Sequence, residues 1–161
     1  MQKIIINNFG PIKYAEIEVK KILVLIGEQA SGKSTIAKLI YFFKTLKEDI
    51  FSQIYQDKNK DCLDIDSVFM LPVKEKFYNF FGSTSNLPNF EITFYYNFHK
   101  NKYLTLTLND DKKLLTQFSD NLLTKDFQSY LNETHKEVQR FFNTENKQFQ
   151  KGLINKIYIT T

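Results

Sequence analysis

Residues 22–35 read I-L-V-L-I-G-E-Q-A-S-G-K-S-T and join an apolar run to a glycine-bearing loop. The apolar residues before Gly27 favour a β-strand that is covered on both faces. From about Lys33 onward, apolar residues recur at helical spacing, which predicts an amphipathic α-helix. The positions in this helical pattern are Ile36, Leu39, Ile40, Phe43 and Leu46, with Ile50 extending it. A strand, a loop and a helix in this order predict an α/β fold with some α+β character.

The loop reads Gly27-Glu28-Gln29-Ala30-Ser31-Gly32-Lys33-Ser34 and fits G-x-x-x-x-G-K-[ST], the phosphate-binding P-loop pattern. Glycines let the backbone approach a phosphate closely, and consecutive N–H groups at a helix start attract an anion. Lys33 is placed to reach the β- and γ-phosphates, the Ser34 hydroxyl to ligate Mg²⁺, and Thr35 to meet the α-phosphate. The pattern therefore predicts nucleotide binding by residues 27–35. The competing interpretation is an ordinary turn that uses Gly-Lys-Ser by chance.

The flanking segments supply the other elements of the expected fold. Two strands, at 3–9 and 15–20, come before the loop and are joined at Gly10-Pro11. The elements predicted after the first helix are a polar loop over 51–66, a helical segment over 67–81 that includes Pro72, strands at 90–98, 103–108 and 113–118, a helix over 120–149, and a strand at 154–160. We expect the strand at 22–26 to be central in a mixed sheet. The hairpins from 90 to 118 should form a separate antiparallel layer.

Composition excludes several classes of protein. The chain has 161 residues, the length of one domain or of a fragment of a larger one, and 42% of them are apolar, which excludes a disordered chain. The single Cys62 excludes a disulfide framework. No apolar run approaches the roughly 18 residues of a membrane helix, so we expect a cytoplasmic protein without a membrane partner. The net charge is +4, and nearly all of the positive charge is lysine, whereas nucleic-acid surfaces usually recruit arginine.

The N-terminal quarter resembles a known family of ATPases. Residues 3–46 contain I-I-I-N-N-F-G-P-I-K-Y-A-E-I-E-V followed by L-V-L-I-G-E-Q-A-S-G-K-S-T-I-A-K-L-I. This is similar to the start of ABC-type ATPase heads of the SMC-like and overcoming-lysogenisation-defect kind, often described as AAA family ATPases. Such heads often carry Asn-Gly at the third and fourth loop positions, where this chain has Gln29-Ala30.

The resemblance implies ATP and Mg²⁺ as ligands and a P-loop NTPase lobe as the fold. It also implies a head-to-head homodimer that sandwiches ATP, with nucleic acid or an effector protein as a partner, in DNA transactions or anti-phage defence. Such heads hydrolyse ATP with a glutamine loop, a signature helix and a strand that ends in Asp-Glu. The chain has no adjacent glycines for a signature motif, and no continuous apolar run ends in Asp-Glu. We therefore expect the chain to be the N-terminal part of a longer ATPase, nearly inactive by itself, with catalytic residues that stay unassigned.

The remaining acidic, histidine and aromatic residues are better interpreted as structural residues than as functional ones. Asp110-Asp111 follow the alternating run 104–108 and suit a solvated hairpin turn better than a metal-binding strand end. His99 and His135 have no second ligand at metal-binding spacing, and the acidic D-C-L-D-I-D run at 61–66 lacks the glycine of a calcium loop. The Phe and Tyr residues at 90–106 alternate, which favours sheet core over base stacking.

Two functional hypotheses from different classes remain. The first is the ATP-binding lobe of an ABC/SMC-like ATPase. The second is a non-catalytic module in which nucleotide is a switch or structural ligand, and the aromatic hairpins contact a partner. A signature helix and an Asp-Glu strand encoded downstream would favour the ATPase.

Overall fold

The two strands expected before the loop form a hairpin. In the computed structural model, which describes residues 1–56 and 66–144, β1 spans Gln2–Phe9 and β2 spans Ile12–Val19. Successive side chains of a strand point to opposite faces, so Ile4 and Ile6 of β1 are fully buried while Ile5 between them is only half-buried. The hairpin turn contains Gly10 at a φ of +58°, a conformation that glycine adopts at no steric cost.

All strands in the described part of the chain belong to one antiparallel sheet, in the order β2-β1-β3-β4-β5. The later strands are β3 (Glu91–Asn97), β4 (Lys102–Leu108) and β5 (Leu114–Phe118), close to their predicted bounds. β3 pairs with β1, so that Ile4 lies opposite Phe94. The α/β class is confirmed, but the mixed sheet and the separate hairpin layer are wrong. β1 and β3 each have an apolar face that must be covered by helices. Because the two strands pair in one sheet, the same helices cover both faces.

The first helix begins where its pattern predicts. α1 spans Lys33–Gln56, which is longer than expected, because residues 51–56 continue the helix in place of a loop. The extra turn is stabilised by Ile54, which is buried against Val68, Phe69 and Leu131 in a second apolar cluster. The remainder of the predicted polar loop, 57–65, lies outside the described residues.

The remaining helical segments follow their sequence signals. Residues Asp66–Met70 form a short π-helix, η1, and α2 (Leu71–Phe81) follows directly. Pro72 lies in the first turn of α2, where its missing N–H has no intrahelical acceptor to lose. α3 spans Lys125–Thr144, so the predicted helix over 120–149 begins later than expected. Its last residues and the predicted strand at 154–160 lie outside the described part of the chain.

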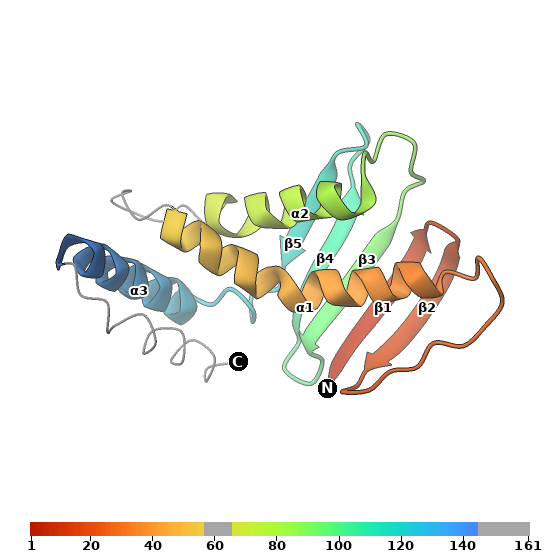
Figure 1. Ribbon diagram of the computed structural model, residues 1–161, viewed down its shortest axis with the longest axis horizontal. Coiled ribbons are helices and arrows are strands. Elements are labelled where there is room, and N and C mark those ends of the chain that lie inside the picture. Colours follow the sequence, from red (N-terminus) through yellow and green to blue (C-terminus); the bar gives the residue numbers. More distant parts are fainter. Residues whose placement is uncertain (57–65, 145–161) are drawn as a thin grey trace.

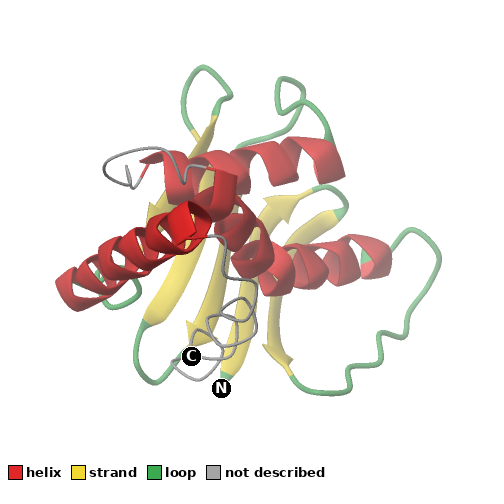
Figure 2. Cartoon of the chain, turned by 60° about the vertical axis from the view of Figure 1, so that its left-hand side comes forward, coloured by secondary structure: helices red, strands yellow, loops and turns green. Residues whose placement is uncertain are grey.

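Helices α1 and α2 cover one face of the sheet (Figures 1 and 2). Between them and the sheet lies an aromatic core, in which the Phe43 ring stacks on Phe94 with centroids 4.9 Å apart. Phe77 of α2 is fully buried and contacts Phe9 and Phe90 from the sheet side. Each such side chain contributes about 1.5–3 kcal/mol by leaving water. This core therefore fixes α1, and with it the end of the glycine-bearing loop, against the sheet.

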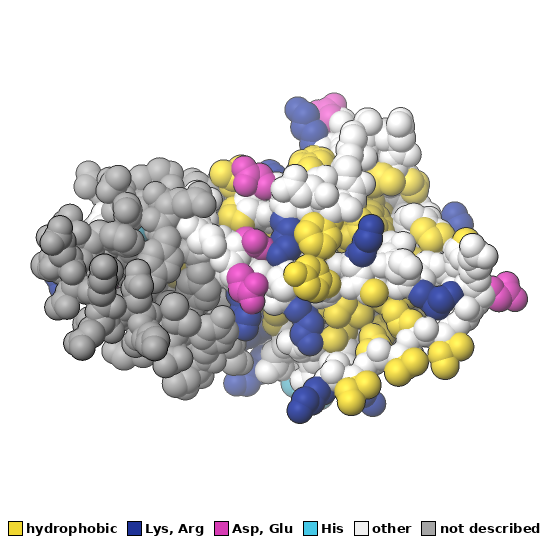
Figure 3. Space-filling model, viewed as in Figure 1, with side chains coloured by type: hydrophobic (Ala, Val, Ile, Leu, Met, Phe, Trp, Pro, Cys, Tyr) yellow, Lys and Arg dark blue, Asp and Glu magenta, His cyan; other side chains and the backbone are white. Residues whose placement is uncertain are grey.

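The segment at 22–26 differs from its prediction. It forms no strand and runs as an irregular stretch between β2 and α1 (Figure 1). Ile26 is 91% exposed, Ile22 80% and Val24 72%, and hydrophobic side chains line this stretch in the space-filling view (Figure 3). The prediction of a central strand is wrong for this structure. An all-apolar strand needs neighbours and cover on both faces, whereas the described strands complete their sheet without it.

Candidate phosphate-binding site

Helix α1 presents its N-terminus to the glycine-bearing loop. Its first backbone hydrogen bond runs from the N–H of Ile36 to the Gly32 carbonyl, at 2.9 Å. The N–H groups of Lys33, Ser34 and Thr35 come before this bond, at the positive end of the helix dipole. Such N–H groups attract phosphate, so the structure brings together the groups that the motif requires at this end of the loop.

Gly32 is fixed against the N-terminal hairpin. Its φ is +92°, and a Cβ at this position would lie 2.7 Å from Cγ1 of Ile12 and 3.4 Å from Cγ of Pro11. A Cβ on Gly10 would meet Thr35 Cγ2 at 3.9 Å, so the hairpin turn lies beside the start of α1. Sequence reasoning missed this role of the turn. The only local signal is the Gly10-Pro11 pair, which predicts a turn but not its contact with the loop.

The Lys33 side chain turns back into its own loop. Its ammonium Nζ donates to the Gly27 carbonyl at 2.8 Å and to the Ser31 hydroxyl at 3.2 Å, and it also donates to the Glu28 carbonyl. The cation is therefore surrounded by loop oxygens. A phosphate group offers the same kind of oxygen acceptor with a full negative charge, so Lys33 can exchange these contacts for charge-assisted bonds to phosphate.

Ser34 and Thr35 lie in the first turn of α1, Ser34 exposed and Thr35 half-buried. An exposed hydroxyl suits Mg²⁺, which keeps several waters and takes few protein ligands besides phosphate oxygens. Within residues 1–56 and 66–144, no group of three or more His, Cys, Asp or Glu side chains could hold a metal ion. Ser34 lies at the start of α1, where the motif predicts a Mg²⁺ ligand.

The middle of the loop is exposed and has one unusual backbone conformation. Glu28, Gln29 and Ala30 are all exposed, so their side chains are free of the core. Ala30 has a φ of +61°, in the left-handed region that disfavours a Cβ. This is the position where the resembling ATPases often have glycine. The chain therefore keeps the loop conformation at a steric cost that glycine would not have.

Replacing Ala30 with glycine should stabilise the protein by about 1 kcal/mol, because it removes the Cβ from a left-handed residue. The same change at Ala37, an exposed helical residue of α1, should destabilise it by about 1 kcal/mol. Urea unfolding of both variants measures the two shifts. Shifts of the same sign for Ala30→Gly and Ala37→Gly would contradict the left-handed conformation of Ala30.

Among the described residues, the remaining acidic and histidine candidates lie in separate turns and helices, and they form no cluster that could hold a metal ion. Asp110 and Asp111 are exposed in the turn between β4 and β5, which the Asn109 N–H closes by donating to the Lys113 carbonyl at 3.0 Å. His99 lies in the β3–β4 turn and His135 is buried on α3. Of the acidic run at 61–66, only the backbone of its last residue is described.

Phe94 and Tyr96 of β3 lie on its core face, as their alternation predicts, whereas Tyr95 lies on the opposite face against Tyr103 and Phe98. Phe94 is fully buried, and the Tyr96 hydroxyl donates to the Phe43 carbonyl at 3.1 Å. Burial raises the pKa of Tyr96 far above its ordinary value, because the phenolate would be desolvated. Phe94 and Tyr96 thus pack against α1, which leaves neither ring free to stack on a base.

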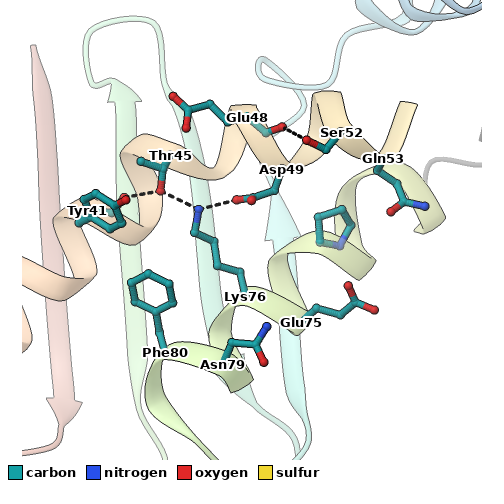
Figure 4. A pocket seen from close by; sticks show the side chains of 11 residues that line it. Tyr41, Thr45, Glu48, Asp49, Ser52, Gln53, Glu75, Lys76, Asn79 and Phe80 are labelled. Carbon is teal, nitrogen blue, oxygen red and sulfur yellow. Dashed lines mark hydrogen bonds and ion pairs between the residues drawn. The ribbon is translucent and has the colours of Figure 1, made fainter. Parts of the chain in front are cut away.

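A cavity of about 450 Å³ lies between α1 and α2, away from the loop (Figure 4). Lys76 reaches across it from α2, donates to the Thr45 hydroxyl at 2.6 Å and forms an ion pair with Asp49. Its ammonium also lies 5.9 Å from the centre of the Phe80 ring. No residue of the segment 27–35 lines this cavity. Lys76 therefore joins the two helices, and the cavity is separate from the phosphate site.

A glycine-bearing loop that ends at a helix N-terminus, with a lysine and a hydroxyl in the first turn, defines the P-loop class of nucleotide-binding proteins. The chain belongs to the AAA ATPase domain family, whose model matches residues 1–160. The family uses ATP, so the nucleotide-binding prediction is confirmed at this general level. No curated protein and no solved structure matches the chain. In the described ranges, no helix is long and apolar enough to cross a bilayer.

Proposed function

We propose that residues 27–35 bind Mg-ATP and that this chain is the N-terminal lobe of a longer ABC/SMC-like ATPase. The observation that carries the proposal is the position of Lys33 and Ser34 in the first turn of α1, directly after the glycine-bearing loop. Lys33 would neutralise the β- and γ-phosphates, Ser34 would ligate Mg²⁺, and Thr35 would meet the α-phosphate. Bound Mg-ATP supplies a phosphoanhydride bond, whose cleavage needs further groups.

Hydrolysis would depend on a C-terminal lobe and on a second head. Phosphoryl transfer needs a group that orients the attacking water, in addition to groups that stabilise the developing charge. Among the described residues, Lys33 and the loop N–H groups would stabilise the developing charge. The nearest candidate for a group that orients the water is the exposed Asp110-Asp111 turn. The exposed apolar segment at 22–26 supports the same proposal, because it offers a surface for a further part of the protein.

The biological setting follows from the resemblance alone. Heads of this type work as homodimers in the cytoplasm, with nucleic acid or an effector protein as partner. We extend this to DNA transactions or anti-phage defence as the role of the full-length protein.

The test compares residues 1–161 with the full-length protein. Calorimetry should detect Mg-ATP binding to residues 1–161, and chelation of Mg²⁺ should weaken it. In a phosphate-release assay, residues 1–161 should turn over far below the roughly 1 per second of slow ordinary enzymes, whereas the full-length protein should hydrolyse ATP.

Two outcomes would contradict the proposal. Turnover near 1 per second by residues 1–161 alone, abolished by Lys33→Ala, would place a catalytic group inside this chain, and Asp110 and Asp111 would be the first residues to replace. Binding without turnover in the full-length protein would instead favour the non-catalytic nucleotide switch.

A further inference from the structure

Strand β5 forms the edge of the sheet opposite β2 (Figure 1). It pairs with β4 on one side and has no neighbouring strand among the described residues on the other. Its sequence, L-L-T-Q-F at Leu114–Phe118, contains no charge and no proline, whereas the edge strand β2 carries Lys13, Glu16 and Glu18. Charges and proline are the usual protection of a free edge, so β5 has the composition of a strand that is paired on both sides.

The backbone groups of β5 point alternately toward β4 and toward the free edge. Ser119, directly after the strand, donates its N–H to the Tyr103 carbonyl at 3.0 Å. In an antiparallel pair such bonds recur at every second residue, which directs 117 and 115 toward β4 as well. The Leu114 N–H accordingly points the other way and donates to the Tyr78 hydroxyl of α2 at 3.4 Å, a long contact that a partner carbonyl can replace. The residues that present N–H and C=O groups to the free edge are therefore Leu114, Thr116 and Phe118.

Thr116, in the middle of this edge, carries an unsatisfied polar group. Its hydroxyl oxygen is buried and has no hydrogen-bond partner, which is costly for a polar group out of water. The residue as a whole is only half-buried, so a rotation about its first side-chain bond brings the hydroxyl toward the edge. Thr93 and Thr105, directly opposite each other on β3 and β4, show the contact that would satisfy it, with their hydroxyls 2.9 Å apart.

We propose that β5 pairs antiparallel with β5 of a second copy of this chain, about a two-fold axis at Thr116. This register places Thr116 opposite itself and Leu114 opposite Phe118 of the second copy, and any other register leaves at least one of these residues unpaired. Each copy then supplies the threonine that the other lacks. The strand ends also match, because Lys113 precedes β5 and Asp120 follows it, so antiparallel pairing brings opposite charges together.

This interface goes beyond the proposed function and does not depend on it. The glycine-bearing loop contacts the β1–β2 hairpin at Ile12, at the other end of the strand order. A head-to-head dimer would hold ATP between two such loops, whereas pairing of β5 needs no nucleotide. It joins the two sheets into one, with main-chain hydrogen bonds across the edge. One short strand makes a small interface, so we expect a reversible dimer in exchange with the monomer.

Disulfide crosslinking tests the register. Leu115 would lie opposite Gln117 of the second copy as a non-hydrogen-bonded pair, with Cα atoms about 4.5 Å apart, which a disulfide can span. Both side chains are exposed, so cysteine at either position should leave the fold intact. In a Cys62→Ser background, an equimolar mixture of the Leu115→Cys and Gln117→Cys proteins should crosslink about tenfold faster under mild oxidation than either protein alone.

The matched control uses the other edge of the sheet. Glu16 and Glu18 are exposed on β2 with the same two-residue spacing. A mixture of the Glu16→Cys and Glu18→Cys proteins, in the same Cys62→Ser background, should crosslink no faster than its components.

Sedimentation velocity and hydrogen exchange without nucleotide test the association itself. The dimer fraction should rise with protein concentration, and the Thr116 and Phe118 amides should become protected in step with it. Thr116→Pro removes an N–H that faces the free edge, where proline is tolerated in strands, so it should raise the dimer Kd about tenfold or more. Lys33→Ala should leave the dimer unchanged. Should Thr116→Pro fail to fold, the crosslinking result decides.

Three results would overturn the proposal. The first is a chain that stays monomeric at every concentration, or a Leu115→Cys and Gln117→Cys mixture that crosslinks no faster than its components. The second is protection of the Thr116 and Phe118 amides that is independent of concentration, because another segment of the same chain would then cover the edge. The third is a dimer that requires ATP and is lost in Lys33→Ala, which would be the head-to-head dimer of the proposed function.

Discussion

The Lys33→Ala variant of residues 1–161 should bind Mg-ATP ten- to a hundredfold more weakly than the wild type. The substitution removes a charge-assisted contact to phosphate, which is worth about 1.5–3 kcal/mol. In the absence of nucleotide the same ammonium contacts loop oxygens at Gly27, Glu28 and Ser31, so part of its binding energy is already used there. We therefore expect the lower part of this range.

Calorimetry with Mg-ATP measures the change, and Lys38→Ala is the matched control. Lys38 is an exposed lysine of the same helix, in its second turn, so the variant loses the same charge without losing the loop contact. Its ATP affinity should stay within about threefold of the wild type, since salt largely screens an exposed charge that makes no contact with the ligand. Equal affinities for Lys33→Ala and the wild type would contradict the assignment of the phosphate site.

Local patterns in the sequence were sufficient for most of the fold. The helical spacing from Ile36 to Leu46 places the start of α1 at Lys33, because one face of that helix must cover the sheet. Alternation in 103–108 likewise predicts β4, whose Leu104 and Leu106 are fully buried. Each pattern indicates only which side chains of one helix or strand are buried, and it can be recognised within that element alone.

What the sequence could not determine depends on partners distant in the chain. The run at 22–26 has the composition of a buried strand, yet Ile22, Val24 and Ile26 are exposed, so the prediction of a buried strand is wrong for this structure. The pairing of β3 with β1 joins residues nearly ninety positions apart, and no local pattern specifies it. Ile54 shows the same limit, because its contacts with Val68 and Leu131 extend α1 through a stretch that looks like a loop.

The candidate site, too, could be predicted from the sequence only in part. The motif identifies Gly27, Gly32, Lys33 and Ser34 from their spacing, because phosphate chemistry requires those residue types in that order. It does not report that Lys33 contacts loop carbonyls or that Ala30 is left-handed. Nor does it report that Ile12 lies against Gly32, since this contact depends on how the hairpin meets the loop.

This last contact leads to the second large effect. Gly32→Ala should lower the free energy of unfolding by about 2–5 kcal/mol, the sum of about 1–2 kcal/mol for a Cβ in a left-handed residue and about 1–3 kcal/mol for overpacking. The new Cβ would lie 2.7 Å from Cγ1 of Ile12, which is only 5% exposed and has little room to move. The hairpin and the loop would have to separate, so ATP binding should weaken in parallel.

Gly82→Ala is the control that separates the two contributions. Gly82 has a φ of +77° at the end of α2, but a Cβ there would meet no atom within 4 Å. Its ψ of −161° puts it in a region that essentially only glycine adopts, so this variant should lose about 1–3 kcal/mol, from the backbone conformation alone. Urea unfolding measures both. The double variant Ile12→Ala with Gly32→Ala should lose less than the sum of the two single losses, because the alanine at position 12 has no Cγ1 for the new Cβ to meet. Equal losses for Gly32→Ala and Gly82→Ala, with additive losses in the double variant, would show that the hairpin does not support the loop. The position of the phosphate site would then depend on α1 alone.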